Sequence, residues 1–164
     1  MAPTRTLDTS TLGLVARGIA RRPELWRAHV VANPTQRHYH RLVSEPHMTV
    51  WMICWMPGQT TGFHDHDGAG GAVAVVEGAI CEERLRFADA PVRTEHGPGD
   101  VLSFGPDDIH RVTHLEGEPA VTIHAYSPEL RRMGSYVEGP GGVLMRVAQD
   151  EEHELQELPA LTPA

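Results

Sequence analysis

From Pro34 to about residue 150, glycine, proline and aspartate breaks divide the chain into short apolar segments. These segments have the length and the Val, Ile and Thr content that are typical of buried or half-buried β-strands. The pattern therefore predicts an all-β barrel or sandwich. We expect strands at Met48–Trp55, Gly71–Val76, Ala79–Phe87, Val101–Phe104, His110–His114 and Ala120–Tyr126, with a last pair near Ser135–Val137 and Leu144–Ala148.

The segment before Pro34 has a helical pattern instead. Apolar residues recur at helical spacing between Leu12 and Val30, and Pro23 interrupts the series. Because proline suits the first turn of a helix, we expect two short helices, the second running from Pro23 to about Val31.

The chain of 164 residues is long enough to enclose one core without disulfides. No linker or long repeat divides the sequence, so we expect one domain over residues 1–164. It comprises a helical segment at about 8–33, a β-barrel at about 34–150 and a tail at 151–164. The tail is acidic and contains proline, and we expect it to be mobile.

Charge and cysteine content limit the partners and the compartment. The 14 Lys and Arg against 22 Asp and Glu give a net charge of -8, so we expect no nucleic acid and no membrane as partners. No apolar stretch approaches the roughly 20 residues that span a bilayer. We expect a cytoplasmic monomer or weak homodimer, with Cys54 and Cys81 as free, buried thiols and a single disulfide between them as the alternative.

Three of the eleven histidines have the spacing of metal ligands. His64 and His66 are separated by one residue, and side chains at i and i+2 of a strand share a face. His110 lies at the start of a later strand candidate and can supply a third imidazole. Converging imidazoles bind divalent first-row metals, so the sequence predicts a metal site at His64, His66 and His110.

The stretches around these histidines resemble the two motifs of the cupin superfamily. The resemblance runs from roughly Met48 to Tyr126, with Pro106 displaced by one position from the second motif. It implies a cupin, a jelly-roll-like β-barrel, here preceded by short helices. The matching positions are Gly58, His64, His66 and Gly78 in the first motif and Gly99 and His110 in the second.

The glutamate that many cupins use as a fourth ligand would fall at Gly70 or Gly71. In this respect the chain resembles the three-histidine thiol dioxygenases of the cysteine dioxygenase type I family. Some members of that family cross-link a cysteine at the position of Gly71 to a tyrosine, and glycine cannot form this bond.

The same family carries Ser-x-His-x-Tyr followed by Ser-Pro, and the corresponding residues here are Thr122, His124, Tyr126, Ser127 and Pro128. The resemblance implies that Thr122, His124 and Tyr126 are catalytic residues, linked in a relay whose phenol reaches the metal site. It also implies a cis peptide bond between Ser127 and Pro128.

The family's substrate-binding Tyr-x-Arg is matched by Tyr39 and Arg41, with one residue of difference in loop length. Arginine suits a substrate carboxylate because its planar fork binds both oxygens. An ungapped alignment places His40 at this position instead.

Taken together, the resemblance implies a non-haem Fe(II) enzyme whose partners are a small thiol substrate and O2. The expected reaction is the oxidation of L-cysteine to cysteine sulfinic acid. The alternatives are a dioxygenase of another small thiol such as 3-mercaptopropionate, a cupin enzyme with a different reaction, and a metal-binding cupin without turnover.

Overall fold

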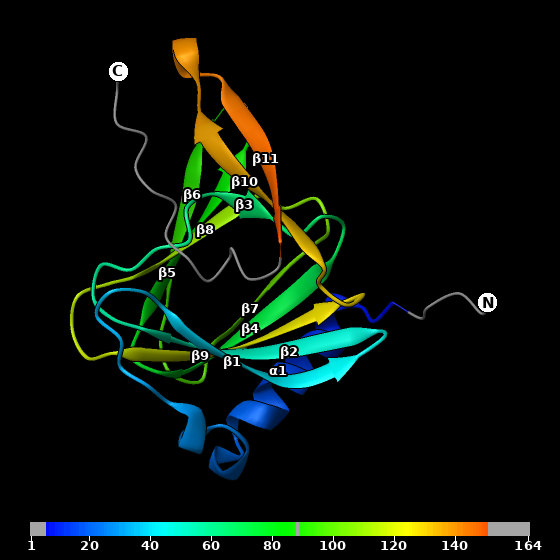
Figure 1. Ribbon diagram of the computed structural model, residues 1–164, viewed down its shortest axis with the longest axis vertical. Helices are drawn as coiled ribbons and strands as arrows, with labels where there is room; N and C mark the ends of the chain where they lie inside the picture. Colours follow the sequence, from blue (N-terminus) through cyan, green and yellow to red (C-terminus); the bar gives the residue numbers. More distant parts are fainter. Residues whose placement is uncertain (1–5, 88, 151–164) are drawn as a thin grey trace.

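The computed structural model describes residues 6–87 and 89–150, and the expected tail at 151–164 lies outside these ranges. The described chain forms two antiparallel β-sheets that enclose a core, with a helix packed outside one of them (Figure 1). The predicted all-β barrel with a preceding helix is confirmed.

The five-stranded sheet contains, in spatial order, β1 (His38–Glu45), β2 (Met48–Trp55), β9 (Ala120–Ser127), β4 (Gly70–Glu77) and β7 (Val101–Phe104). The six-stranded sheet contains β11 (Leu144–Asp150), β10 (Arg132–Glu138), β3 (His64–Asp65), β8 (His110–His114), β5 (Ile80–Arg86) and β6 (Asp89–His96). The helices are α1 (Thr9–Ala20) and the 3-10 turns η1 (Pro23–Leu25), η2 (Arg27–His29) and η3 (Pro140–Gly142).

Each predicted strand is present, with ends shifted by a few residues. The strands at His38–Glu45 and Asp89–His96 were not among the expected strands, and the residues of the second are almost all exposed and show no apolar alternation. This second strand is an edge strand and contains Pro91, which is consistent with the tolerance of edges for proline. β3 is only two residues long, and it joins β10 to β8.

The prediction of a second α-helix after Pro23 is wrong. Two 3-10 turns replace it, separated by Trp26, whose φ of -135° is not helical. This break turns the indole inward, where it is buried and donates a hydrogen bond to the carbonyl of Ala20 at 3.2 Å. Burial of this large aromatic side chain thus takes precedence over helix continuation.

The central strands β2, β9 and β4 of the five-stranded sheet are buried along most of their length, and α1 covers the outer side of β9, β4 and β7 (Figure 1). On β9, Val121, Ile123 and Ala125 belong to the apolar cluster beneath α1. The alternate residues therefore point into the barrel, since successive side chains of a strand face opposite ways. The polar residues of β9 are thereby placed in the interior.

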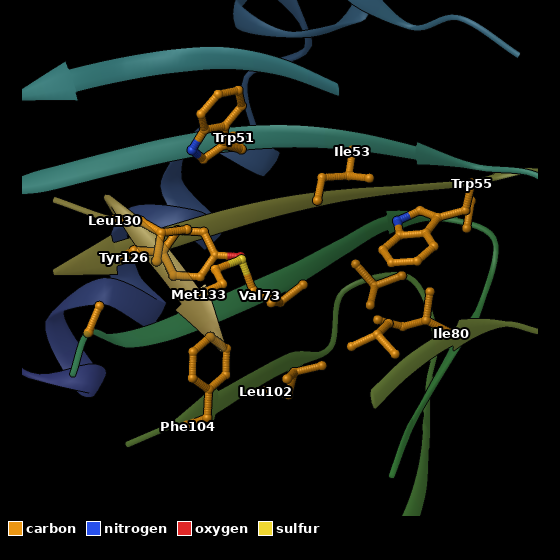
Figure 2. Packing of buried hydrophobic residues seen from close by; sticks show 14 residues of the cluster. Trp51, Ile53, Trp55, Val73, Ile80, Leu102, Phe104, Tyr126, Leu130 and Met133 are labelled. Atoms are coloured by element: carbon orange, nitrogen blue, oxygen red, sulfur yellow. The ribbon is translucent and has the colours of Figure 1, made fainter. Parts of the chain in front are cut away.

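The interior cluster is formed by apolar and aromatic side chains from both sheets. Figure 2 shows Trp51 and Tyr126 near one end of this cluster, and Trp55 and Ile80 near the other. All four residues are nearly or completely buried. Phe104 and Tyr126 belong to this cluster and lie against His66.

Cys54 and Cys81 are free and buried, as expected. Burial raises the pKa of both thiols, so both stay protonated at neutral pH. Within residues 6–87 and 89–150, we find no helix with the length and apolar character needed to cross a membrane.

Candidate metal centre and catalytic relay

The structure brings His64, His66 and His110 together inside the barrel. His64 on β3 lies directly opposite His110 on β8, and His66 follows β3. The three side chains are buried, and one ring nitrogen from each lies within 4.8 Å of the others. This group could hold a metal ion.

Hydrogen bonds orient two of the three rings. Nδ1 of His64 lies 3.1 Å from the carbonyl oxygen of Gly62, and Nδ1 of His110 lies 2.7 Å from a carboxylate oxygen of Glu82. Carbonyl and ionised carboxylate oxygens only accept, so each Nδ1 carries a proton and Nε2 is the ring nitrogen left to bind a metal. A neutral imidazole is the form that binds a metal.

Burial lowers the pKa of His110 to about 3, although its hydrogen bond with Glu82 acts in the opposite direction. The ring is therefore neutral at physiological pH even before a metal binds. Nε2 of His110 is buried and has no hydrogen-bond partner among the described residues. An orphaned lone pair of this kind fits a metal ligand.

Phe104 forms one wall of the site. Its ring stacks on His66, with centroids 4.3 Å apart and an interplanar angle of 18°. Gly71 pairs with Phe104 on β7, and a Cβ atom at Gly71 would overlap the Phe104 ring. Phe104 therefore fills the space that a side chain at position 71 would occupy.

A chain of buried hydrogen bonds approaches the three histidines from β9. Trp55 Nε1 donates to Thr122 Oγ1 at 2.8 Å, and this hydroxyl lies 2.7 Å from His124 Nε2. His124 Nδ1 lies 3.1 Å from the phenol oxygen of Tyr126. The Tyr126 ring centroid is 5.2 Å from that of His66. Thr122, His124 and Tyr126 are thus linked in the predicted order, and Ser127–Pro128 is the predicted cis peptide bond.

The indole of Trp55 favours one direction for this chain, because an indole nitrogen can only donate. The Thr122 hydroxyl then donates to His124 Nε2 over the short contact, since its other acceptor, the Ile53 carbonyl, is 3.5 Å away. Nδ1 of His124 consequently carries a proton and donates to Tyr126. The phenol of Tyr126 thus lies at the end of β9 nearest the three histidines, held by His124.

The predicted substrate-binding residues lie on β1. Tyr39 packs against the interior cluster and meets Trp51 edge to face, and the Arg41 guanidinium lies 4.9 Å above the same indole. His40 is on the opposite face of the strand, where its ring stacks on His29. A bulge follows Arg41 in the pairing of β1 with β2. Strand alternation thus places Arg41 on the same side as Tyr39 and opposite to His40, and the Arg41 residue is exposed.

Glu82 is a site residue that the motif analysis missed. Its carboxylate is buried on β5, bonded to His110 and, at 2.9 Å, to Arg84. Burial alone would raise the pKa of Glu82, but the bonds with His110 and Arg84 outweigh it and lower the pKa to about 2. The sequence could have indicated Glu82, because it lies two residues after Ile80, which faces the core, and side chains at i and i+2 of a strand share a face.

Asp65 is the second residue whose role the motif did not reveal. It accepts hydrogen bonds from Arg146 on β11 at 2.7 and 2.8 Å and from Tyr136 on β10 at 2.7 Å. Burial tends to raise its pKa, yet these donors hold the pKa well below the usual range of a carboxyl. A Cβ at Gly134 would overlap Arg146, so glycine there lets the guanidinium reach Asp65.

A cavity of about 660 Å³ opens beside His66. Its rim carries two arginines: Arg131 pairs with Glu129 at 3.1 Å, and Arg132 pairs with Asp67 at 3.2 Å. The cavity therefore connects one of the three histidines with a charged opening.

A sequence model of the family described as cysteine dioxygenase type I matches residues 14–138, which is most of the chain. This chain belongs to the cysteine dioxygenase type I family. The predicted membership is confirmed, and it supports an oxidoreductase of the oxygenase class that acts on a small molecule and O2. No curated protein sequence matches the chain.

Several solved structures of other proteins have a fold similar to that of this chain. The protein TT1209 from Thermus thermophilus has a TM-score of 0.56 and 18% identity, over 62% of this chain and 92% of its own. A Klebsiella pneumoniae protein with a double-stranded β-helix domain has a TM-score of 0.56 and 17% identity, over 62% and 80%. The cupin domain of Cnp3 from Schizosaccharomyces pombe has a TM-score of 0.52 and 10% identity, over 60% and 65%. These similarities concern the fold alone, and they confirm the predicted cupin barrel.

Proposed function

We propose that the chain is a non-haem Fe(II) thiol dioxygenase that converts L-cysteine and O2 to cysteine sulfinic acid. The observation that carries the proposal is the position of Tyr126. Its phenol belongs to a buried hydrogen-bond chain, and its ring lies 5.2 Å from that of His66. A binding module without turnover has no use for a directed relay beside its metal.

The donor set fits iron. His64, His66 and His110 offer three neutral imidazoles, and imidazole is an intermediate ligand that suits Fe, Zn and Cu. Three protein ligands leave coordination positions open for substrates. Fe(II) in this site would supply the binding of a thiolate and the activation of O2.

The residues of the chain then position the reactants. In this proposal Tyr126 presents its phenol to the substrates, and Thr122 and His124 hold that phenol in place through their hydrogen bonds. Phe104 and Trp51 contribute apolar walls. In the overall reaction, R–SH and O2 give R–SO2H, so both oxygen atoms end on the sulfur and no other oxidant is consumed.

Arg41 binds the substrate carboxylate in this proposal. Register places Arg41 opposite Trp51 on β2, and Trp51 opposite His124 on β9. The guanidinium therefore lies two strands from the relay, on the same side of the sheet. Tyr39 supports the position by packing against Trp51.

3-Mercaptopropionate is the second candidate substrate, and the cavity rim gives the reason. Asp67 and Glu129, the acidic residues among those that line the cavity, are both ion-paired with arginines. Pairing with arginines neutralises these two carboxylates, so they attract a substrate ammonium group less, and 3-mercaptopropionate has no amine.

Oxygen uptake by the Fe(II)-loaded protein tests the proposal, with cysteine, 3-mercaptopropionate and cysteamine compared under the same conditions. We expect one O2 consumed per thiol, a product heavier by both oxygen atoms, and the fastest turnover with cysteine. Disulfide or hydrogen peroxide as the product, or no uptake with any thiol, would refute the dioxygenase. Faster turnover of 3-mercaptopropionate would reassign the substrate.

A further inference from the structure

We infer that Glu82 is a positioning residue that fixes His110 and adds negative charge to the three-histidine centre. Many cupins have a carboxylate ligand that this chain lacks at Gly70 and Gly71. Glu82 would supply a comparable negative charge through its hydrogen bond to His110, without binding the metal itself. The inference deepens the proposed function, because it rests on the metal site that His110 belongs to.

Glu82 contacts His110 directly. Glu82 Oε1 lies 2.7 Å from His110 Nδ1, a length typical of a charge-assisted hydrogen bond. The two side chains are only 7% and 2% exposed, so water competes little for either group. The bond holds the ring so that Nε2 points away from Glu82, toward His64 and His66.

Arg84 holds the Glu82 carboxylate in place beside His110. Arg84 Nη2 bonds the same carboxylate at 2.9 Å and also donates to the Ser103 carbonyl at 2.9 Å. Its Nη1 contacts Asp108 at 3.3 Å. This anchoring from β7 and the turn after it keeps the carboxylate beside His110, as expected for a residue that orients a ligand.

Glu82 also brings a negative charge next to His110. Three neutral imidazoles leave the charge of a divalent metal uncompensated. The partner of His64 Nδ1 is a carbonyl, which is uncharged, whereas the partner of His110 is an ionised carboxylate. A carboxylate that accepts the Nδ1–H bond makes Nε2 a stronger donor, and such partners typically change metal affinity about 10- to 100-fold.

The test compares Glu82→Gln with the parent protein, using Co(II) as a spectroscopic probe and the Fe(III)/Fe(II) potential of the iron-loaded protein. Glutamine keeps an acceptor for His110 but removes the charge. We expect the Co(II) affinity to fall about 10-fold or more and the potential to become more positive. Both readouts are independent of thiol oxidation.

Glu83→Gln is the matched control. Glu83 is the next residue, and it pairs with Arg111 at 2.6 Å instead of with a metal-site histidine. Removing its charge should leave the Co(II) affinity and the potential of the parent. An equal effect of the two glutamine variants would show a general effect of net charge and overturn the inference.

Glu82→Asp separates charge from packing. Aspartate keeps the charge but shortens the reach, so we expect a lower Co(II) affinity with a potential close to that of the parent. A shift as large as that of Glu82→Gln would overturn the role of charge. If Glu82→Gln does not fold, Glu82→Asp decides alone: reduced affinity with the parent's unfolding transition supports the inference, and unchanged affinity overturns it.

The two proposals fail in different ways. Metal affinity of Glu82→Gln equal to the parent's refutes the role of Glu82 and leaves the dioxygenase proposal intact. Lack of thiol oxidation in the parent refutes the dioxygenase but leaves an affinity loss in Glu82→Gln as support for this inference. A parent protein that binds neither Co(II) nor Fe(II) overturns both.

Discussion

The guanidinium of Arg146 binds the carboxylate of Asp65 with two hydrogen bonds across 81 residues of sequence. Asp65 stands between His64 and His66, so the contact ties the C-terminal hairpin of β10 and β11 to the segment that carries two of the three histidines. The geometry of the candidate metal centre thus depends on a residue far outside the cupin motifs.

Replacing Arg146 with methionine should destabilise the protein and weaken metal binding. A charge-assisted hydrogen bond contributes on the order of 1.5–3 kcal/mol. Since the Arg146 side chain is 37% exposed, we expect a loss of about 1–2 kcal/mol after allowing for solvent screening. Denaturant unfolding of the metal-free protein measures this loss of unfolding free energy. Arg132→Met breaks a more exposed pair with Asp67 and should cost less than about 0.5 kcal/mol; equal losses would contradict the prediction.

Alanine at His64, His66 or His110 should remove most of the bound iron, because each variant loses one of three ligands. Metal analysis of the purified variants after Fe(II) loading measures the effect. His40→Ala is the control and should keep its iron, since His40 stacks on His29 outside the site. A His110→Ala protein with full iron content would place the third ligand elsewhere.

Thr122→Val should lower kcat with a smaller effect on KM. Valine keeps the shape of threonine but cannot connect Trp55 Nε1 with His124 Nε2. Two buried groups lose their partner, at a stability cost of about 1–3 kcal/mol. Thr122→Ser restores the hydroxyl and should restore kcat. Steady-state kinetics compares the three forms. A fully active valine variant would show that turnover does not depend on the hydrogen bond between Thr122 and His124.

Arg41→Ala should raise the KM for cysteine about 10-fold to a few hundredfold, since each charge-assisted bond to a carboxylate contributes roughly 1.5–3 kcal/mol. Iron content should not change. Cysteamine, which has no carboxylate, should be a poor substrate of the parent and should be unaffected by the substitution. If cysteine kinetics stay the same in Arg41→Ala, the carboxylate binds at another cation, and Arg131 at the cavity rim is the next candidate.

Gly71→Ala should reduce both stability and metal affinity, because its Cβ would overlap Phe104, which stacks on His66. Overpacking of a buried site costs about 1–3 kcal/mol. The neighbouring Gly70→Ala is the control, since a Cβ there makes only ordinary contacts of 3.5 Å. Adding Phe104→Leu to Gly71→Ala should recover part of the loss. Thermal unfolding with and without Co(II) measures both effects.

The alternation of side chains along strands explains why much of the site could be predicted. Thr122, His124 and Tyr126 are spaced by two, so any strand that includes them brings them to one face. The same rule places Tyr39 and Arg41 together and turns His40 away. The spacing of His64 and His66 is equally informative, although only the first of them belongs to β3.

Contacts between strands could not be predicted, because they depend on which strands become neighbours. Glu82 meets His110 only because β5 pairs with β8, in a register that sets Arg84 opposite His110. Arg146 reaches Asp65 only because β11 follows β10 beside β3 and Gly134 leaves room. Such pairings arise from the closure of the barrel and leave no local pattern in the sequence.

The short length of β3 affects how cooperatively the six-stranded sheet unfolds. The two residues of β3 are the link through which β10 and β11 join the rest of their sheet in the described chain. A hairpin held by so short a link can open as a separate unit while the other strands stay paired. A metal bound to His64 and His110 stabilises that link, so ligand occupancy is coupled to hairpin closure. At a free-metal concentration about 100 times Kd, linkage stabilises the closed form by about 2.7 kcal/mol. Amide hydrogen exchange in β10 is therefore a gauge of metal occupancy that needs no substrate.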